Sequence, residues 1–321
     1  MTSAPIPLSE AAAWLKGRDD VAVLCHQSPD GDTFGSGAAL VRALRALGKR
    51  AQLFCCDSTP ERFAFLFEGL EQQDFPPQTI VAVDIADEQL LGGLRERFGG
   101  KVQLCIDHHP SNTHYAQRYY VDPKAAATCE IMVDLIPLLG VPLDRSIAID
   151  LYTGLSTDTG CFQYINVTPH THRVAARLLE LDIPAPQINH AMFATKSRQR
   201  IALEAAAMQA VEFYRNGEIA VIPLTLEMRQ KAGATDDDTD GVASIPRSIE
   251  GVRVGATLKE KGPDLVKVSL RCLQPVNASA ICGEFGGGGH PGAAGCAIHA
   301  GLQEAKEQLL KAINAYLEAH P

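Results

Sequence analysis

The feature that most constrains this chain is a regular alternation of short apolar runs with amphipathic stretches, between Val21 and about Ile165. The apolar runs are rich in β-branched residues, which is typical of buried strands, and the stretches between them carry apolar residues at helical spacing. Strands that alternate with helices in this way predict a doubly wound, largely parallel α/β sheet. The candidate strands are 21–25, 51–55, 79–84 and 102–107, and the candidate helices are 36–47, 88–98, 127–139 and 144–155.

The pattern changes beyond about residue 195. Residues 197–214 are alanine-rich and contain neither Gly nor Pro, which predicts a connecting helix. Strand-like runs, a glycine cluster and a final amphipathic helix from about 302 to 319 follow, and together they predict a smaller mixed α/β domain. We therefore expect a first domain of residues 1–195, a connecting helix within 196–215 and a second domain of residues 216–321.

Composition narrows the class of protein. The 321 residues are 46% hydrophobic, which is enough for two cores, and the net charge of −9 argues against extended, non-specific binding of nucleic acid. A negative net charge does not exclude small anionic substrates. No stretch approaches the roughly 18 apolar residues of a membrane span, and the N-terminus lacks the features of a signal peptide, so we expect a cytoplasmic protein. The nine cysteines show no CxxC spacing and predict reduced thiols rather than disulfides or a zinc site.

Acidic and histidine side chains follow the apolar runs of the first domain. They are His26, Asp30 and Asp32 in HQSPDGD, Asp84 in VAVDIAD, Asp107, His108 and His109 in DHHPSN, and Asp158 in GLSTDTG. A single residue of this kind is often a helix cap or a solvated turn residue. Because the carboxyl ends of parallel strands share one edge of a sheet, however, several of them are expected to converge there.

Converging carboxylates repel one another unless cations compensate them. A set of oxygen ligands with one or two imidazoles and no thiolate suits Mn²⁺ or Mg²⁺ better than structural zinc. Two such ions about 3.5–4 Å apart are a common arrangement for in-line attack on phosphorus. The residues alone therefore favour a site for one or two divalent ions, and phosphorus chemistry is one use of such a site.

The four motifs HQSPDGD, VAVDIAD, DHHPSN and GLSTDTG together resemble those of the DHH phosphoesterases. The resemblance extends to the second domain, where GGGGHPGAAG after the run SLRC is similar to the DHH-associated domain that binds nucleotides. The arrangement, without added domains, most resembles the oligoribonuclease and 3′-phosphoadenosine-5′-phosphate (pAp) phosphatase branch, the nano-RNases.

The resemblance implies two divalent ions, with Mn²⁺ favoured and Mg²⁺ or Co²⁺ as alternatives. It implies that His26, Asp30 and Asp84 hold one ion, and that Asp32, Asp84, His108 and Asp158 hold the other, so that Asp84 bridges them. His109 would face the substrate phosphate and stabilise the transition state or protonate the leaving oxygen. Asp107 would orient the histidines, or would serve only as a structural residue at the end of its strand. Asp87 is expected to cap the helix that begins at Glu88.

In the second domain, strand alternation in LVKVSLRC places Lys267, Ser269 and Arg271 on one face. Arg271 could pair with a phosphate, although an isolated strand arginine is usually only exposed to solvent; the resemblance favours the phosphate. The family often has Ser where this chain has Cys272, which puts any contact from that position in doubt. The further candidates for substrate binding are Gly286, Gly287, Gly288, Gly289 and His290, with Arg247 as a weaker one.

We therefore expect hydrolysis of short oligoribonucleotides, of about two to five nucleotides, to mononucleotides and of pAp to AMP, with the nucleotide held between the two lobes. One alternative is a phosphodiesterase for linear products of cyclic dinucleotides, such as pApA. Another is a regulatory module that senses a nucleotide without cutting it. Long nucleic acids and membranes are not expected partners, and the oligomeric state, including a homodimer, stays open together with the cleavage polarity and the metal used in the cell.

Overall fold

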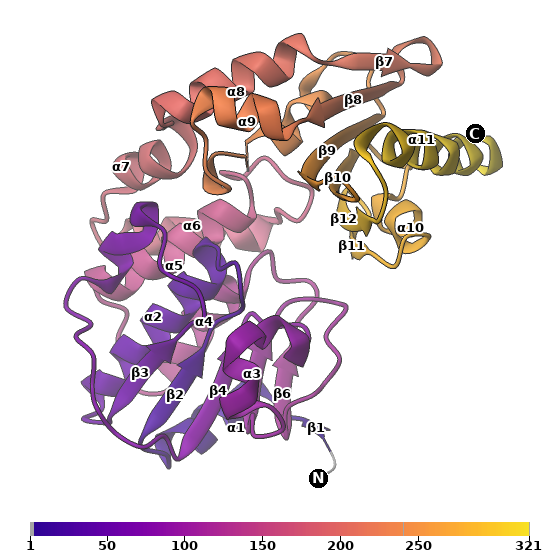
Figure 1. Cartoon of the computed structure of the whole chain (residues 1–321). Coiled ribbons are helices and arrows are strands. Elements are labelled where there is room, and N and C mark those ends of the chain that lie inside the picture. The colour runs from indigo at the N-terminus through magenta and orange to yellow at the C-terminus, as the bar shows by residue number, and fades with distance from the viewer. Residues whose placement is uncertain (1–2, 240, 321) are drawn as a thin grey trace. The chain divides into compact units, whose positions relative to one another are not determined.

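The computed structural model describes residues 3–239 and 241–320, and Figure 1 traces the chain. The chain divides into two units, residues 1–195 and 196–321. Among the residues described, no helix has both the length and the apolar character needed to cross a membrane.

The first unit is built on a six-stranded sheet in the order β1-β6-β5-β4-β2-β3, and every neighbouring pair in it is parallel. This confirms the predicted parallel sheet, although β1 and β6 were not among the predicted strands. The strands are β1 Ala4–Pro5, β2 Val21–Leu24, β3 Ala51–Phe54, β4 Thr79–Val83, β5 Leu104–Asp107 and β6 Arg118–Val121.

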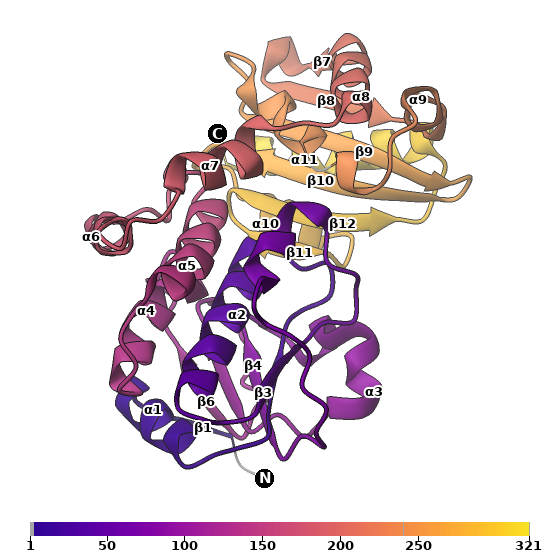
Figure 2. The same ribbon diagram turned by 90° about the vertical axis from the view of Figure 1, so that its left-hand side faces the viewer.

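Helices cover both faces of this sheet, as Figure 2 shows. Side chains such as Val23 and Val83 point into a core shared with α1, α2, α4 and α5, whereas Leu24 and Ala82 point into a core on the side of α3. The helical segments are α1 Leu8–Lys16, α2 Gly31–Ala46, η1 Glu61–Phe67, η2 Glu88–Leu94, α3 Arg95–Phe98, α4 Thr128–Leu138, α5 Arg145–Asp158, α6 Pro169–Leu179, α7 Ala185–Asn189 and η3 His190–Ala194. The two-sided burial explains why the strands are apolar throughout rather than alternating.

The single helix predicted over residues 88–98 is instead a 3₁₀ segment, η2, followed by the short helix α3. The chain bends at Gly92, where φ is +53°, and a Cβ there would lie 2.8 Å from the Sγ of Cys56. Glycine is therefore required at the bend, which breaks the helix. Asp87 caps the segment as predicted, since its carboxylate accepts a hydrogen bond from the backbone N–H of Gln89 at 2.7 Å.

The second unit contains a mixed sheet in the order β11-β12-β10-β9-β8-β7. Only β8 and β9 run parallel among its described pairs, and the other pairs are antiparallel. The strands are β7 Glu212–Tyr214, β8 Ile219–Leu224, β9 Val254–Gly262, β10 Leu265–Cys272, β11 Gly288–His290 and β12 Ala293–Ile298; the helical segments are α8 Arg198–Gln209, η4 Arg215–Gly217, α9 Leu226–Ala232, η5 Asp237–Thr239, η6 Val242–Ser244, η7 Pro246–Ser248, α10 Ala278–Gly283 and α11 Leu302–Ala319. Helices α10 and α11 share the main core with this sheet.

The alanine-rich helix α8 packs as part of the second unit. Its Leu203 and Ala207 are buried against Ile222 and Leu224 of β8. The helix ends at Gln209, and the following residues Glu212–Tyr214 form β7, which pairs with β8. Residues 197–214 are therefore not one continuous helix, because pairing with β8 outweighs the helix propensity of the last turn.

Candidate functional site

The ends of three neighbouring strands carry the predicted first-unit side chains. His26 lies two residues after β2, Asp84 follows β4 directly, and His108 and His109 follow β5. Strands β5, β4 and β2 are adjacent in the sheet. Their carboxyl ends therefore bring these residues to one edge, as expected for a ligand site in an open parallel sheet.

Two carboxylates come from the start of α2. Asp30 caps this helix, since its Oδ1 accepts hydrogen bonds from the backbone N–H groups of Asp32 and Thr33 at 3.0 and 3.1 Å. Asp32 lies in the first turn and is buried. Its two oxygens accept hydrogen bonds from the first backbone N–H groups of α4, those of Thr128 at 2.6 Å and Cys129 at 2.8 Å. Helix N-termini favour negative charge, so both helices stabilise these carboxylates.

Asp158 is contributed by a helix and not by a strand, because it is the last residue of α5. Close packing of α5 against α2 positions it. A Cβ on Gly154, one turn earlier, would lie 2.9 Å from Oδ1 of Asp32, so glycine permits this approach.

Asp84 has an unusual backbone and a buried side chain. Its φ is +59°, in the left-handed region that few residues other than glycine adopt. Its backbone N–H donates to the carbonyl of Ile106 at 2.9 Å, and its Oδ1 accepts a hydrogen bond from the hydroxyl of Thr128 at 2.9 Å. Strain of this kind is typical of functional sites, and here it turns the carboxylate into the cluster.

The structure brings all six predicted metal ligands together. Their potential ligand atoms, with those of His109, form three groups in which all atoms lie within 4.8 Å of one another: Asp84, His108 and His109; His26, Asp30 and Asp84; and Asp32, His108 and Asp158. Asp84 and His108 each belong to two groups, so the three groups are linked to one another.

The electrostatics of this cluster favour a bound cation. Burial and repulsion from Asp32 raise the pKa of Asp84 well above its usual range, and the same two causes raise the pKa of Asp158. Burial opposes protonation of His26, but hydrogen bonds to Asp30 and Asp84 outweigh it and raise its pKa to about 11. Ionised carboxylates at this density need compensating positive charge, and their oxygen and imidazole donors suit hard divalent ions. The residues present therefore fit a divalent-metal centre.

Asp107 holds His109 in place. Its Oδ1 lies 2.8 Å from Nδ1 of His109 and accepts a hydrogen bond from the backbone N–H of His108 at 2.8 Å. Its Oδ2 accepts from the side-chain amide of Asn112 at 2.6 Å. Burial alone would raise the pKa of Asp107, but these partners keep it below its usual value. With Nδ1 occupied by Asp107, Nε2 is the nitrogen through which His109 would act on another molecule.

Sequence reasoning did not identify Thr128 or Asn112 as functional residues. Thr128 contacts two of the cluster carboxylates, through its backbone N–H and through its hydroxyl. Its position at the start of the helix predicted over residues 127–139 was the signal that could have marked it. Asn112 lies within the quoted motif DHHPSN, but nothing in its spacing indicated a contact with Asp107.

In the second unit, strand register places the predicted substrate-binding residues on one face of the sheet. Arg271 of β10 lies opposite Ala293 of β12, which in turn lies opposite His290 of β11. Ser269 forms the next row with Gly295 and Gly288. Directly opposed residues point to the same side of a sheet, so Arg271, Ser269 and His290 share a face.

Arg247 belongs to the same neighbourhood. Gly255 of β9 lies opposite Arg271 on its other side, and a Cβ on Gly255 would lie 2.8 Å from the backbone nitrogen of Arg247. Cys272, by contrast, is buried in the core that faces α10 and α11, and burial raises the pKa of its thiol to about 12. A side chain at position 272 therefore points away from Arg271.

The glycine cluster has a packing role within the unit. Gly289 has a φ of +143°, and a Cβ on it would lie 2.6 Å from the carbonyl oxygen of Ala293; one on Gly287 would lie 2.8 Å from Cα of Cys296. Gly286, with a φ of +70°, has no such neighbour but needs the left-handed backbone that glycine adopts readily. Gly288 and Gly289 form β11 with His290, so these glycines allow β11 to lie close to β12.

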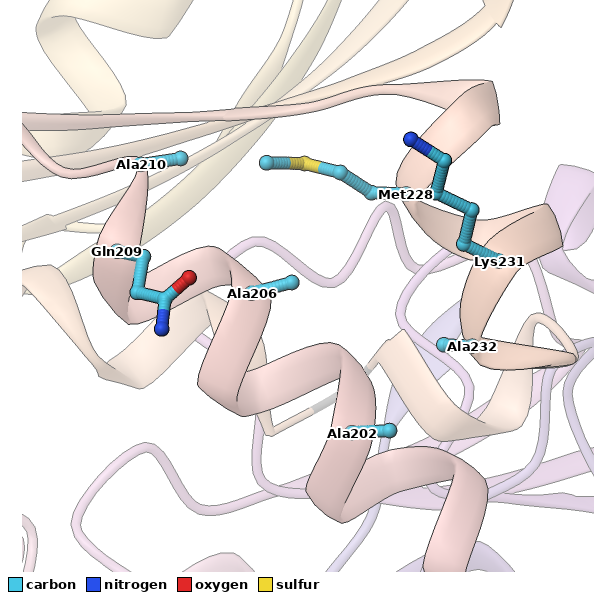
Figure 3. A pocket seen from close by; sticks show the side chains of 7 residues that line it. All are labelled: Ala202, Ala206, Gln209, Ala210, Met228, Lys231 and Ala232. Atoms are coloured by element: carbon cyan, nitrogen blue, oxygen red, sulfur yellow. The ribbon is translucent and has the colours of Figure 1, made fainter.

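A cavity of about 400 Å³ lies elsewhere in the second unit, between α8 and α9. Figure 3 shows Met228 extending from α9 toward Ala210. The lining contains none of the predicted site residues: it consists of Ala202, Ala206, Gln209, Ala210, Met228, Lys231 and Ala232. It offers few polar groups, which distinguishes it from the acidic cluster.

Residues 20–155 match the model of the DHH family, N-terminal domain, and residues 216–319 match the DHHA1 domain. The chain belongs to the DHH family of phosphoesterases, a class of hydrolytic enzymes, and carries the DHHA1 domain at its C-terminal end.

Among curated relatives, the chain is similar to the bifunctional oligoribonuclease and PAP phosphatase NrnA of Thermus thermophilus, with 36% identity over 302 residues that cover 92% of this chain and 89% of that protein. It is also similar to the cyclic-di-AMP phosphodiesterase PdeA of Listeria monocytogenes, with 23% identity over 330 residues that cover 93% of this chain but 48% of that protein. Among solved structures, an exopolyphosphatase-related protein of Bacteroides fragilis has the same fold, with a TM-score of 0.88, 23% identity and 96% coverage of both chains.

Proposed function

We propose that this protein is a manganese-dependent phosphoesterase that hydrolyses short oligoribonucleotides to mononucleotides and pAp to AMP. The observation that carries the proposal is the convergence of six carboxylate and imidazole ligands at one sheet edge, in a chain 36% identical to a bifunctional oligoribonuclease and PAP phosphatase. In this proposal residues 1–195 catalyse the reaction in the cytoplasm and residues 216–321 bind the substrate.

The six ligands divide between two ions. His26, Asp30 and Asp84 would hold one, and Asp84 would be shared with a second ion held by Asp32, His108 and Asp158. Divalent ions held by these residues would supply charge neutralisation at the phosphate and activation of a water molecule for attack on phosphorus. The protein's own contribution is to hold the ligands rigidly, through the α2 and α4 N-termini and the hydroxyl of Thr128.

His109 would act on the substrate phosphate. Asp107 fixes its ring by binding Nδ1, which directs Nε2 away from that carboxylate. His109 could then stabilise charge on the transferred phosphate or give a proton to the leaving oxygen. Asp107 would act as a positioning residue, and its hydrogen bond from Asn112 supports that role.

The second domain would grip the nucleotide. Arg271 can donate two parallel hydrogen bonds to a phosphate, and His290 lies in the same row of the same sheet face. Ser269, Arg247 and the backbone of Gly286, Gly287, Gly288 and Gly289 would complete the contacts. Binding energy gained from the terminal nucleotide would orient the scissile phosphate, so a few nucleotides suffice.

The similarity to the cyclic-di-AMP phosphodiesterase PdeA supports a second candidate, a phosphodiesterase that opens or trims cyclic-dinucleotide products such as pApA. A sensing module without catalysis is the remaining alternative, and the complete ligand set argues against it, since a non-catalytic relative would be expected to lose a ligand.

One experiment separates these functions. The purified chain is incubated with Mn²⁺ and end-labelled RNAs of about two to twenty nucleotides, with pAp and pApA in parallel, and the products are resolved by length. We expect kcat/KM to peak at about two to five nucleotides, because additional phosphates meet an acidic protein. If a twenty-nucleotide RNA is cleaved as fast as a dinucleotide, the short-substrate proposal is contradicted. Exclusive cleavage of pApA would select the second candidate. Binding without cleavage would select the sensing module.

A further inference from the structure

Four basic side chains gather at one end of the same sheet face in the second unit. Lys259 and Lys261 lie on β9, Lys267 lies on β10 and Arg229 lies on α9. Helix α9 packs against β9, and Figure 2 shows the two elements near each other. We call these four residues the basic end. They lie in a protein whose net charge is −9, so their grouping runs against its overall balance.

The register of β9 and β10 creates an unfavourable pair within this group. Lys259 lies directly opposite Lys267, and side chains opposed in this way have Cβ atoms about 4.5–5.5 Å apart. Like charges at that distance destabilise a strand pair. Lys267 is exposed, and among the residues that the structure describes it forms no ion pair.

One carboxylate compensates the other three cations. Asp236 lies 2.8 Å from the ammonium nitrogens of Lys259 and Lys261, and 2.6 Å from a guanidinium nitrogen of Arg229. Its side chain is 58% exposed, whereas those three cations are between 16% and 22% exposed. A single exposed carboxylate thus sits over largely buried cations, in the position that an oxyanion from solution could take.

Positive charge is incompletely compensated there. The Nε of Arg229 is buried without a hydrogen-bond partner in the described part of the chain. Burial and the neighbouring Lys261 and Arg229 lower the pKa of Lys259, although Asp236 opposes them, which indicates that positive charge is crowded. A phosphodiester carries the same charge as a carboxylate and could take the place of Asp236 beside the ammonium and guanidinium groups.

Small residues lie along one side of the strip between Arg271 and the basic end. Ala297 lies opposite Lys267 and Gly295 lies opposite Ser269, and both Ala297 and Gly295 are exposed. Arg271 and Lys267 are four residues apart on one strand, a separation of about 13 Å at roughly 3.3 Å per residue. An extended nucleotide chain can lie across small residues, with a phosphate at each end of the strip.

We propose that the basic end is a second phosphate-binding site, which holds a backbone phosphodiester of single-stranded RNA a few nucleotides from the one at Arg271, and that Asp236 is its counterion in the free protein. The inference rests on the proposed function, because it takes the bound chain to be the RNA substrate. It adds a site that favours RNAs longer than a dinucleotide, because two neighbouring phosphates are too close together to lie at both Arg271 and Lys267, which are about 13 Å apart.

The test measures binding and not hydrolysis. The full chain is titrated, in EDTA, against fluorescent RNAs of two and five nucleotides, so that the result does not depend on whether the protein cleaves them. Lys267→Glu should weaken binding of the longer RNA by about 10- to 100-fold, the order expected for one lost charge-assisted contact, and should reduce the advantage of that RNA over the dinucleotide. Asp236→Asn should strengthen binding of the longer RNA.

Lys311→Glu is the matched control, because it reverses one exposed charge on α11, which packs on the other face of the sheet. The assignment is overturned if Lys267→Glu behaves like Lys311→Glu, or if it weakens the two RNAs equally, since that pattern would reflect only long-range charge. In a second measurement, inorganic phosphate competes with the fluorescent five-nucleotide RNA at constant ionic strength. If inorganic phosphate displaces that RNA as effectively as unlabelled five-nucleotide RNA does, the basic end is a site for free phosphate instead.

Discussion

Replacement of Thr128 by valine should weaken metal binding without altering any metal ligand. The hydroxyl of Thr128 donates to Oδ1 of Asp84 at 2.9 Å, and both side chains are buried, so water cannot replace the lost donor. Valine keeps the shape of the side chain, and the backbone N–H that binds Asp32 remains. The substitution therefore removes one hydrogen bond to the carboxylate that the two proposed ions share.

The size of the effect follows from the charge on the acceptor. A hydrogen bond to a charged group contributes about 1.5–3 kcal/mol, and each 1.4 kcal/mol corresponds to about tenfold in affinity. Burial and repulsion from Asp32 raise the pKa of Asp84 and so disfavour its ionised form in the metal-free protein, and the hydroxyl is expected to matter most when a cation stabilises that form. The loss falls on the metal-bound state, and we expect the Kd for Mn²⁺ to rise by about 10- to 100-fold.

Isothermal titration calorimetry with Mn²⁺ measures this directly, beside the Tm of the metal-free protein. Thr153→Val is the matched control: Thr153 is fully buried in α5, and its hydroxyl donates at 2.7 Å to the carbonyl of Ile149 rather than to a carboxylate. The control should change Tm but not metal affinity. A Thr128→Val protein that binds Mn²⁺ within about twofold of the wild type, or a control that loses as much, would refute the reasoning.

Further predictions concern the proposed ligands, the proton and the substrate. Asp84→Asn should abolish turnover and lower the number of ions bound, as metal analysis and rate assays would show; retention of about a tenth of the rate would contradict the bridging role. Asp107→Asn should lower kcat by about 10- to 100-fold with metal affinity kept, and a substrate with a good leaving group should recover rate if His109 supplies the proton. Because burial raises the pKa values of Asp84 and Asp158, both hold protons above the usual range in the metal-free protein. Binding must release them, so metal affinity should fall as pH is lowered, which calorimetry in two buffers would detect as proton release. Arg271→Ala should reduce kcat/KM on a dinucleotide by a factor that corresponds to a loss of about 1.5–3 kcal/mol in transition-state stabilisation. An unchanged kcat/KM would remove Arg271 from the substrate site.

The sequence alone determined the kinds of element and the kinds of side chain in the proposed metal site. The apolar runs around Val23 and Val83 form parallel strands, as predicted, because burial on both faces leaves a local pattern that needs no knowledge of the partners. The positions of His26 and Asp84 after their strands indicated a shared edge for the same reason: parallel strands end on the same side. The motifs supplied the family, and its model matches residues 20–155.

Tertiary structure decided what holds those ligands in place. The hydrogen bonds from Thr128 to Asp84 and from the α4 N-terminus to Asp32 join residues 44 and 96 positions apart, and no periodicity in the chain encodes contacts of that range. The approach of Gly154 to Asp32 likewise depends on how α5 packs against α2. Backbone and helix-end contacts of this kind depend on three-dimensional packing, so they become visible only when the elements are placed.

In the second unit, strand pairing decided which side chains lie beside one another on the sheet and where α8 ends. Alternation predicted that Lys267 and Arg271 share a face, but only the register with β9 and β12 places Lys259 and the exposed Ala297 beside Lys267. A shift of one residue in either pairing would have turned those neighbours into the core. The end of α8 at Gln209 was decided in the same way, since the residues after it gain more from pairing with β8 than from another helical turn. Local pattern determines which face a side chain takes, and long-range pairing determines which side chains share it.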